Sequence, residues 1–394
     1  MRVVVVDEGP PFPLDTGKKI RTFNLMKRLS RRHEITYICY GYGPVPPEVS
    51  GIRFVFLKKR LLEQRGAGFY LSLIRNLASY RPYVVERHYS AEMAETVSRH
   101  VKNGCDLIHC EWTPYTEAIR EHLGSKPAVL SAHNVESQIW KRYLENEGSL
   151  LKREYIRVQY RKLLAYEVAL CRKYDRVAAV SRLDKEHFQR QYACRNVDIV
   201  PNGVDETYFK PADEAIEPNS IVFTGSMDWR PNQDGIRFFL QEIWPEIKNE
   251  LRGAKFYIAG RRPPGWLVKI GAAGNDVIVT GGVEDVRPYI AKAGLYVVPL
   301  RIGGGSRLKI LEALAMKKVV LSTTLGAEGL DLSNGVHFYL EDRPHEFARM
   351  AVHVLKSLGR HAHIAEKGCQ AVLAGYTWDS IAELMDACWM KAVG

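Results

Sequence analysis

Two series of short apolar runs, each interrupted by helical segments, constrain the fold of this chain more than any other feature. The runs are continuous and rich in β-branched residues, which is typical of parallel strands that are buried on both faces. The alternation with helices predicts an α/β fold with doubly wound parallel sheets. The first series comprises RVVVVD (2–7), EITYICY (34–40), GIRFVFLK (51–58), DLIHC (106–110), PAVLSAHN (127–134) and RVAAVS (176–181). The second comprises SIVFTGS (220–226), AKFYIAG (254–260), DVIVTGGV (276–283), LYVVPL (295–300) and KVVLST (318–323).

The two series predict two Rossmann-like domains, because each can form a sheet of its own and 394 residues exceed one ordinary core. A polar, proline-containing joint, DEAIEPNS (213–220), lies between them. We therefore expect an N-terminal domain over residues 1–205 and a C-terminal domain over 206–375, facing a central crevice. An amphipathic helix over 376–394 either caps the second domain or crosses back to join the first, which is our assignment. One long helical stretch is expected over 136–174.

The apolar content and the cysteines exclude membrane-spanning and disulfide-rich classes of protein. No apolar segment approaches the roughly 18–20 residues that a membrane-spanning helix needs. The opening MRVVVVDEG predicts a strand instead of a signal peptide. The seven cysteines are odd in number, scattered, and without a paired metal-ligand motif, so they predict buried free thiols in a reducing cytoplasm and no metal site.

The net charge of +11 lies entirely in the N-terminal half. Residues 1–210 hold 35 Lys and Arg against 24 Asp and Glu, whereas residues 211–394 hold 21 of each. This asymmetry predicts that the N-terminal half meets an anionic partner. Nucleic acid is not favoured, because no helix-turn-helix or aromatic-interleaved groove motif accompanies the charge. The segment LKKRLLEQRGAGFYLSLIRNL (57–77) fits either an anionic membrane surface or a solvated basic helix of a soluble enzyme.

The stretch RIGGGSRLKILEALA (301–315) follows a predicted strand and leads into a predicted helix, and it contains glycines and cations at this connection. Glycines allow the backbone to approach a ligand, and a helix N-terminus offers free N–H groups and positive partial charge. Arg307 and Lys309 in the first turn oppose the helix dipole, which an anionic ligand would correct. We predict a phosphate site here, with a serine N-cap and with Glu312 accepting bonds from hydroxyls beyond the phosphate. Its residues are Arg301, Gly303, Gly304, Gly305, Ser306, Arg307, Lys309 and Glu312.

Three further loops follow predicted strands and provide polar side chains. In FTGSMDWRPNQDGI (223–236), the side chains of Arg230 and Asn232 can point at the same crevice as Lys309, although Asn232 is equally suited to cap a helix. No P-loop, dinucleotide fingerprint or trustworthy Ser-His-Asp order is present. The candidate residues from the three loops are Gly225, Ser226, Arg230 and Asn232 in the second half, and Gly17, Lys18, Arg21, His133, Asn134 and Glu136 in the first.

Several segments together resemble family 4 of the retaining glycosyltransferases, which have the GT-B fold. They are GGGSRLKILEALAMKKVVLSTTLGAEGL, VPNGVDETYF, RVAAVSRLDKE and FTGSMDWRPN, and the resemblance covers nearly the whole chain. It is greatest to bacterial sugar transferases of polysaccharide biosynthesis. The resemblance implies a nucleotide-diphospho-sugar donor held mainly by the C-terminal half. It also implies a hydroxyl acceptor (a glycan, a lipid-linked molecule or a small molecule) held mainly by the N-terminal half. A cytoplasmic enzyme without a metal cofactor, able to lie on the inner face of the membrane, is expected.

The resemblance also implies roles for individual residues. Glu312 matches the glutamate that binds the nucleotide ribose, and Lys309 lies near the diphosphate. Gly282 and Val283 match the loop that faces the nucleobase through its backbone. His133 stands where the family places a histidine near the donor sugar and the reaction centre, and Gly17 stands beneath the sugar and phosphates. His133, Lys309 and Glu312 are therefore the catalytic candidates, while the acceptor candidates are Lys18, Arg21, Asn134 and Glu136.

Two departures from the family pattern concern the donor site. Gly304 stands where the family's first motif glutamate belongs, and Ser226 stands where many members have an arginine. The sequence suggests that Arg230, Arg301 or Arg307 substitutes for that arginine. A GT-B epimerase or phosphorylase, or a non-catalytic nucleotide-sugar binding protein, would share the phosphate loop and stays an alternative.

Overall fold

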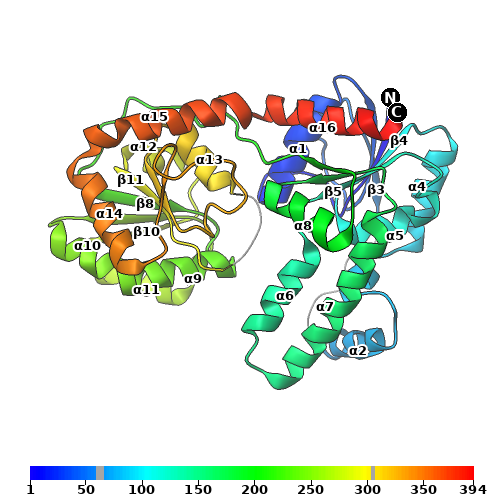
Figure 1. The fold of residues 1–394 in the computed structure, drawn as a ribbon, viewed down its shortest axis with the longest axis horizontal. Helices are drawn as coiled ribbons and strands as arrows, with labels where there is room; N and C mark the ends of the chain where they lie inside the picture. Colours follow the sequence, from blue (N-terminus) through cyan, green and yellow to red (C-terminus); the bar gives the residue numbers. More distant parts are fainter. Residues whose placement is uncertain (59–65, 303–306) are drawn as a thin grey trace. The chain divides into compact units, whose positions relative to one another are not determined.

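The chain divides into two compact units in a computed structural model that describes residues 1–58, 66–302 and 307–394 (Figure 1). The first unit comprises Met1–Pro201 together with Asp379–Gly394, and the second comprises Asn202–Trp378. Each unit is a parallel sheet with helices on both faces. The predicted fold class, two doubly wound α/β domains, is therefore confirmed.

The first unit is built on a parallel sheet whose described strands follow the order β3-β2-β1-β4-β5-β6-β7. The direction of strand order changes between β1 and β4, which is where loops of such sheets open a crevice at the carboxyl ends. The strands are β1 (Arg2–Val6), β2 (Glu34–Tyr40), β3 (Arg53–Leu57), β4 (Leu107–Cys110), β5 (Ala128–Ala132), β6 (Arg176–Ala179) and β7 (Val197–Ile199). Its helices are α1 (Gly17–Leu29), α2 (Gly66–Leu77), α3 (Tyr83–His88), α4 (Ala91–Lys102), α5 (Thr116–Ile119), α6 (Glu136–Asn146), α7 (Leu150–Cys171) and α8 (Arg182–Tyr192), with short 3-10 turns at 47–49, 113–115 and 120–122.

The second unit repeats the plan with the strand order β10-β9-β8-β11-β12-β13. Its strands are β8 (Ser220–Thr224), β9 (Lys255–Ala259), β10 (Val277–Gly281), β11 (Leu295–Val298), β12 (Val320–Ser322) and β13 (Tyr339–Leu340). Its helices are α9 (Arg230–Phe238), a π-turn (Phe239–Ile243), α10 (Trp244–Glu250), α11 (Gly265–Ala273), α12 (Arg287–Lys292), α13 (Leu308–Ala315), α14 (Pro344–Lys356) and α15 (Leu358–Gly375).

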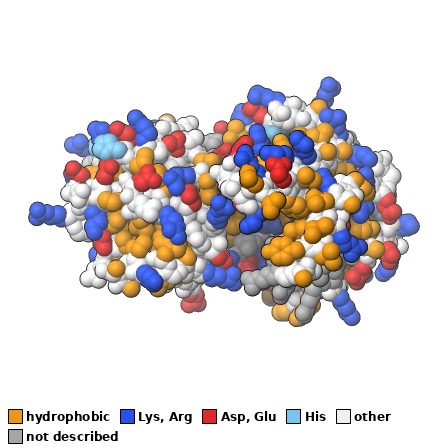
Figure 2. Space-filling model, turned by 90° about the horizontal axis from the view of Figure 1, so that it is seen from below, with side chains coloured by type: hydrophobic (Ala, Val, Ile, Leu, Met, Phe, Trp, Pro, Cys, Tyr) orange, Lys and Arg blue, Asp and Glu red, His pale blue; other side chains and the backbone are white. Residues whose placement is uncertain are grey.

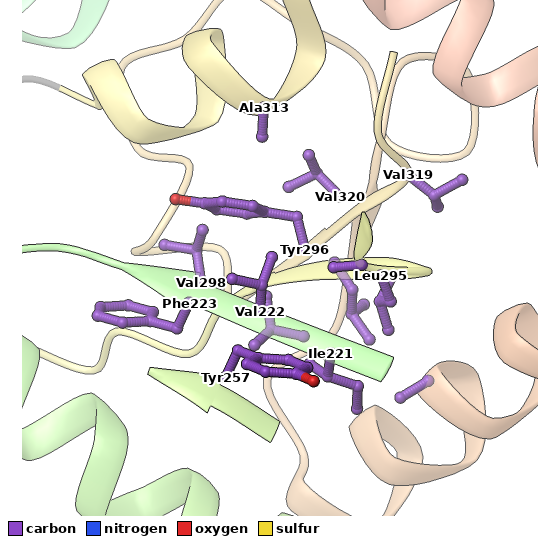
Figure 3. Close-up of a cluster of buried hydrophobic side chains, with 14 of the residues drawn as sticks. Ile221, Val222, Phe223, Tyr257, Leu295, Tyr296, Val298, Ala313, Val319 and Val320 are labelled. Atoms are coloured by element: carbon purple, nitrogen blue, oxygen red, sulfur yellow. The ribbon is translucent and has the colours of Figure 1, made fainter. Parts of the chain in front are cut away.

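Central strands of the second unit are buried on both faces, which explains their unbroken apolar sequence. Figure 3 shows side chains of β8 and β11 packed with Tyr257 of β9, Ala313 of α13 and Val320 of β12. Because successive side chains of a strand point to opposite faces, a continuous apolar run is needed wherever helices cover both.

The C-terminal helix α16 (Trp378–Val393) belongs to the first unit from Asp379 onward. It is anchored to α1 by Arg28, whose Nε lies 2.6 Å from Asp379, and to the segment after α1 by His33, whose Nε2 lies 2.7 Å from Asp386. The structure thus places this helix on the first unit, which was one of the two alternatives that the sequence allowed.

The boundaries of the units differ by a few residues from those expected at 205/206 and 375/376. Val204 forms a parallel bridge with Thr377, and Gly203 lies so close to the Trp378 ring that a Cβ would be 2.7 Å from it. Residues 202–205 and 376–378 therefore pack as part of the second unit.

Two expected helices also differ in extent. The stretch 136–174 is not one helix but α6 and α7, which form an antiparallel pair separated by a short connection (Figure 1). The helix expected to begin near Ser306 begins at Leu308 among the described residues, with Arg307 at the N-cap position. Ser306 itself, like Gly303, Gly304 and Gly305, lies outside the described residues.

Backbone crowding at the ends of β8 and β9 generates a stability prediction. A Cβ on Gly260 would lie 1.8 Å from the carbonyl oxygen of Gly225. Gly260→Ala should therefore destabilise the second unit by about 3 kcal/mol and lower its calorimetric Tm by roughly 6–12 °C. Gly265→Ala is the matched control, since its Cβ would meet nothing within 4 Å. Equal Tm values for the two variants would contradict the prediction.

Candidate functional site

The candidate residues fall into two groups, one at the carboxyl ends of the strands of each unit. In open parallel sheets these ends carry the loops that bind ligands. In the second unit the group gathers around Lys309, and in the first unit it gathers around Glu111 and His133.

Lys309 lies in the first turn of α13, and its ammonium group packs against backbone at the end of β8. A Cβ on Gly225 would lie only 2.8 Å from the Lys309 Nζ, and Gly225 has a φ of +153°. The same Nζ donates to Oδ1 of Asn232 at 3.0 Å and lies 4.0 Å from the centroid of the Phe223 ring. Glycine is thus needed at 225 both for the backbone conformation and for the space that the ammonium occupies.

Asn232 connects Lys309 to the loop that follows β8. Its Nδ2 donates to the carbonyl of Ser226 at 2.7 Å, while its Oδ1 accepts from Lys309. The alternative role of helix cap is wrong, because α9 begins at Arg230 with Trp229 at the N-cap position. The side chain is instead buried in the first turn, where it holds the ammonium group in place.

Lys309 and Glu312 titrate near neutrality. Burial lowers the pKa of Lys309 to about 7, although nearby Glu312 opposes the shift, and Arg307 adds to it. Burial likewise raises the pKa of Glu312 to about 7, against the influence of Lys309. An anionic ligand next to Lys309 would favour the protonated form, so this group can take up a proton as it binds an anion.

The three arginines suggested for the phosphate site lie in different surroundings. Arg301 is paired with Asp234 at 3.1 Å and with Glu242 at 3.6 Å. Arg307 is buried and donates to the carbonyl of Leu325 at 2.6 Å. Arg230 is exposed at the start of α9. Arg301 and Arg307 are therefore both held by contacts with other groups of the protein.

Arg261 is a candidate that the sequence reasoning missed. It follows β9 and Gly260, and its Nε donates to the hydroxyl of Ser226 at 2.9 Å. A Cβ on Gly282, in the loop after β10, would lie 3.5 Å from the Cβ of Arg261. The guanidinium therefore lies beside the position where the family arginine is missing. The signal in the sequence was a pair of arginines directly after a strand and a glycine.

Gly282 and half-buried Val283 follow β10 directly, as predicted. They place a glycine-containing loop next to Arg261, at the same edge of the sheet as Gly225 and Ser226.

In the first unit, Glu111 directly follows β4 and is fully buried. Its Oε1 lies 3.1 Å from Nε2 of His109, and its Oε2 lies 2.8 Å from Nε2 of His133. Burial opposes ionisation, but the hydrogen bonds from the two histidines outweigh it and hold the pKa of Glu111 well below its ordinary value. Burial lowers the pKa of His133, against the influence of Glu111. The group therefore consists of an ionised carboxylate and a neutral His133.

Lys18, in the first turn of α1, lies between the carboxylate of Asp7 and the ring of Trp112. Its Nζ lies 2.5 Å from Oδ1 of Asp7 and 5.2 Å from the centroid of the Trp112 ring. Burial would lower the pKa of Lys18, but the carboxylates of Asp7 and Glu8 outweigh burial and raise it. Gly17 precedes it as the first residue of α1, whose N-cap is Thr16.

Glu136 and Asn134 follow β5, as His133 does. Oε1 of Glu136 accepts from the indole Nε1 of Trp112 at 2.8 Å, and burial raises the pKa of Glu136 to about 7. Asn134 is half-buried. The structure thus brings Lys18 and Glu136 together through Trp112, a residue that the sequence reasoning did not select.

Arg21 does not support its predicted role in binding the acceptor. It is 1% exposed, and its guanidinium donates to the carbonyls of Val200 (2.7 Å) and Pro201 (2.5 Å). It holds the end of the segment after β7 against α1, and we do not assign it to the acceptor.

Glu111 and its partner His109 were also missed. The available signal was a carboxylate immediately after a buried apolar strand, in LIHCEW, where a charged residue needs partners. All seven cysteines lie in the described part of the chain and are buried and free, as predicted. Within that part, no cluster of three or more His, Cys, Asp or Glu side chains is arranged to hold a metal ion.

Comparisons with known proteins match both halves. The model of the family "Glycosyltransferase Family 4" matches residues 17–208, and that of "Glycosyl transferases group 1" matches residues 218–357. A relative from Klebsiella pneumoniae, an "uncharacterized 44.6 kDa protein in cps region", is 21% identical over 377 residues, which cover 92% of this chain and 93% of that protein.

Solved structures resemble this chain over nearly its whole length. Sucrose-phosphate synthase from Thermosynechococcus elongatus has a TM-score of 0.71 at 17% identity, covering 99% of this chain and 98% of that one. Anabaena HepE in complex with UDP and glucose has a TM-score of 0.67 at 15% identity, with 98% of both chains covered. The two family models and these likenesses agree with the motifs in the sequence, and the chain belongs to the family 4 glycosyltransferases of the GT-B fold.

Proposed function

We propose that this glycosyltransferase moves a sugar from a nucleotide-diphospho-sugar to a hydroxyl acceptor with retention of anomeric configuration, in polysaccharide or glycoconjugate biosynthesis. The observation that carries the donor half of the proposal is the Lys309 ammonium, seated against the Gly225 backbone in the first turn of α13. The complex of HepE with UDP and glucose makes a UDP-sugar the first donor to try. The occurrence of a relative in the Klebsiella cps region supports the biosynthetic setting.

The difficult step is departure of the nucleoside diphosphate from the anomeric carbon, because negative charge develops on the leaving phosphate. Lys309, protonated when the donor binds, would stabilise that charge. We assign the second cation to Arg261, whose Nε contacts Ser226 at the position of the missing arginine. Glu312, on the same face of α13 as Lys309, would accept from the ribose hydroxyls.

Retention is proposed to follow from attack on the face that the leaving group vacates, with the leaving phosphate accepting the proton of the acceptor hydroxyl. A double displacement would need an available carboxylate as nucleophile. The carboxylate hydrogen-bonded to His133 is that of Glu111, and its two oxygens are already hydrogen-bonded to His109 and His133 inside the core. Asp7 is likewise engaged by Lys18 and Tyr37.

The acceptor is proposed to bind in the first unit, over Trp112 and near Lys18, Asn134 and Glu136. The carboxyl of Glu136 can donate or accept a hydrogen bond near neutral pH, which suits a hydroxyl-bearing molecule. We also propose that no metal is needed, because Lys309, Arg261 and the helix N-terminus together provide positive charge for a diphosphate.

We propose that the first unit lies on an anionic membrane surface through α2. Tyr70, Leu71 and Ile74 are each more than half exposed on this helix, beside the exposed Arg75. Figure 2, seen from below relative to Figure 1, shows hydrophobic side chains gathered next to Lys and Arg side chains. Of the predicted basic segment 57–77, residues 59–65 lie outside the described residues. No helix in the described ranges is long and apolar enough to span a bilayer.

The first test of the function is turnover of a panel of UDP-sugars with glycan and lipid-linked acceptors. We expect UDP release that depends on the acceptor, and ¹H NMR should show a product with the anomeric configuration of the donor. Lys309→Ala should lower kcat by about 10²–10³, the usual cost of losing one preorganised partner for developing charge. Lys269→Ala, an exposed lysine on α11, is the control and should be silent. An inverted product would overturn retention.

The pKa of Lys309 predicts that UDP binds more weakly as pH rises from 7 to 9. The free lysine is charged below its pKa of about 7 and loses its proton above it, whereas bound diphosphate favours the protonated form. Affinity should fall by about tenfold over this range, with proton uptake visible in calorimetry in buffers of different ionisation enthalpy. Lys309→Arg stays charged and should abolish the uptake. A flat wild-type profile without proton uptake would refute the assignment.

The membrane proposal predicts sedimentation of the protein with anionic vesicles but not with neutral ones. The double variant Leu71→Glu, Ile74→Glu should weaken partitioning by about tenfold or more, because two inserted apolar side chains become charged. Leu183→Glu, on α8 and 54% exposed, is the matched control and should leave partitioning unchanged. Salt-insensitive binding, or none, would contradict the proposal.

A further inference from the structure

A series of hydrogen bonds joins the C-terminal helix to His133 through two buried side chains. The indole Nε1 of Trp389, on α16, lies 3.0 Å from Nδ1 of His109 on β4. His109 in turn contacts Glu111 through Nε2 at 3.1 Å, and Glu111 contacts Nε2 of His133 at 2.8 Å. Trp389, His109 and Glu111 are all 0% exposed. Water therefore cannot replace any of the three partners without opening the core.

The donor and acceptor of each bond follow from the chemistry of the groups. An indole N–H can only donate, so Nδ1 of His109 accepts and its proton resides on Nε2. That N–H donates to Oε1 of Glu111. An ionised carboxylate can only accept, so Nε2 of His133 must also carry a proton and donate to Oε2. In neutral His133, Nδ1 then holds the lone pair.

We propose that Trp389 and His109 are positioning residues that fix His133, through Glu111, as a hydrogen-bond acceptor at Nδ1 for a substrate hydroxyl. The role of His133 in contacting substrate rests on the proposed function. The arrangement of the other three residues does not, because it exists in the free protein. A histidine fixed in this way would accept a hydrogen bond from a hydroxyl through Nδ1 but would not donate one from that nitrogen to a phosphate oxygen.

Packing around Trp389 keeps the indole in the required orientation. Its ring meets His109 and His33 edge-on, each with ring centroids 5.4 Å apart. One helical turn earlier, Asp386 contacts His33 at 2.7 Å, so α16 is attached to the segment between α1 and β2 next to the indole. The orientation of Trp389 is therefore determined by two neighbours besides the hydrogen bond to His109.

The first experiment measures the tautomers directly in the free protein. ¹⁵N-histidine NMR, with signals assigned by omission in His109→Gln and His133→Gln, distinguishes protonated from unprotonated ring nitrogens. We expect the proton on Nε2 in both His109 and His133. Trp389→Phe removes the donor while keeping an aromatic ring, so Nδ1 of His109 loses its hydrogen-bond partner; the Nδ1 signal of His109 should shift and the signals of His133 should be perturbed. Trp378→Phe, at the other end of α16 and also buried, is the matched control and should leave both unchanged.

The second experiment measures transfer from the donor established in the turnover panel. Trp389→Phe should lower kcat by about five- to tenfold, the effect of one lost hydrogen bond, with KM for the donor unchanged. His109→Gln can still accept from the indole and donate to Glu111, so it should stay within about threefold of wild type, whereas His109→Leu should lose more than tenfold.

Two results would overturn the proposal: a proton on Nδ1 of His133, or equal effects of Trp389→Phe and Trp378→Phe on the histidine signals. Failure of the wild type to transfer any sugar would instead refute the proposed function, and the NMR experiment would still decide how the four residues are connected.

Discussion

The first unit depends on one buried charge, the carboxylate of Glu111. An ionised carboxylate inside a protein core costs several kcal/mol unless its oxygens are hydrogen-bonded. His109 and His133 provide those bonds: His109 lies on β4, the strand that Glu111 follows, and His133 lies just after the neighbouring strand β5. The carboxylate therefore fixes the relative positions of β4, the loop after β5 and, through His109, the C-terminal helix. Removing either histidine would leave one oxygen of the buried carboxylate without its hydrogen-bond partner, which would weaken the connection between these elements.

The corresponding feature of the second unit is a cation that packs against the backbone. At the ends of β8 and β9 the chain has glycines at 225 and 260. A Cβ on Gly260 would collide with the backbone of Gly225, and a Cβ on Gly225 would collide with the side chains of Lys309 and Asn232. The space left at Gly225 receives the Lys309 ammonium, and burial there depresses its pKa. A lysine whose protonated form is favoured by a bound anion suits the diphosphate of the proposed donor, on which negative charge develops during transfer.

The fold class could be predicted from the sequence, and so could the site residues that belong to a recognisable motif or to a glycine-containing turn. Apolar runs predicted the strands except the short β7 and β13. Glycines followed by cations predicted Lys309, and the end of an apolar run predicted Gly225. Contacts between residues distant in sequence could not be predicted. Trp389 and His109 are 280 positions apart, and Arg261 reaches Ser226 from another strand. For the same reason Arg21 was misassigned: its sequence position beside Lys18 does not reveal that its guanidinium faces the carbonyls of Val200 and Pro201.

The placement of α16 has a consequence for the order in which the protein can be completed during synthesis. The first unit needs residues 379–394, yet these leave the ribosome only after the whole of residues 202–378 has been made. Until then His109 lacks its indole partner, and Arg28 of α1 and His33, which follows α1, lack their carboxylate partners on α16. The N-terminal unit can therefore begin to fold first but is completed last. Its core stays incomplete while the second unit is synthesised and folds.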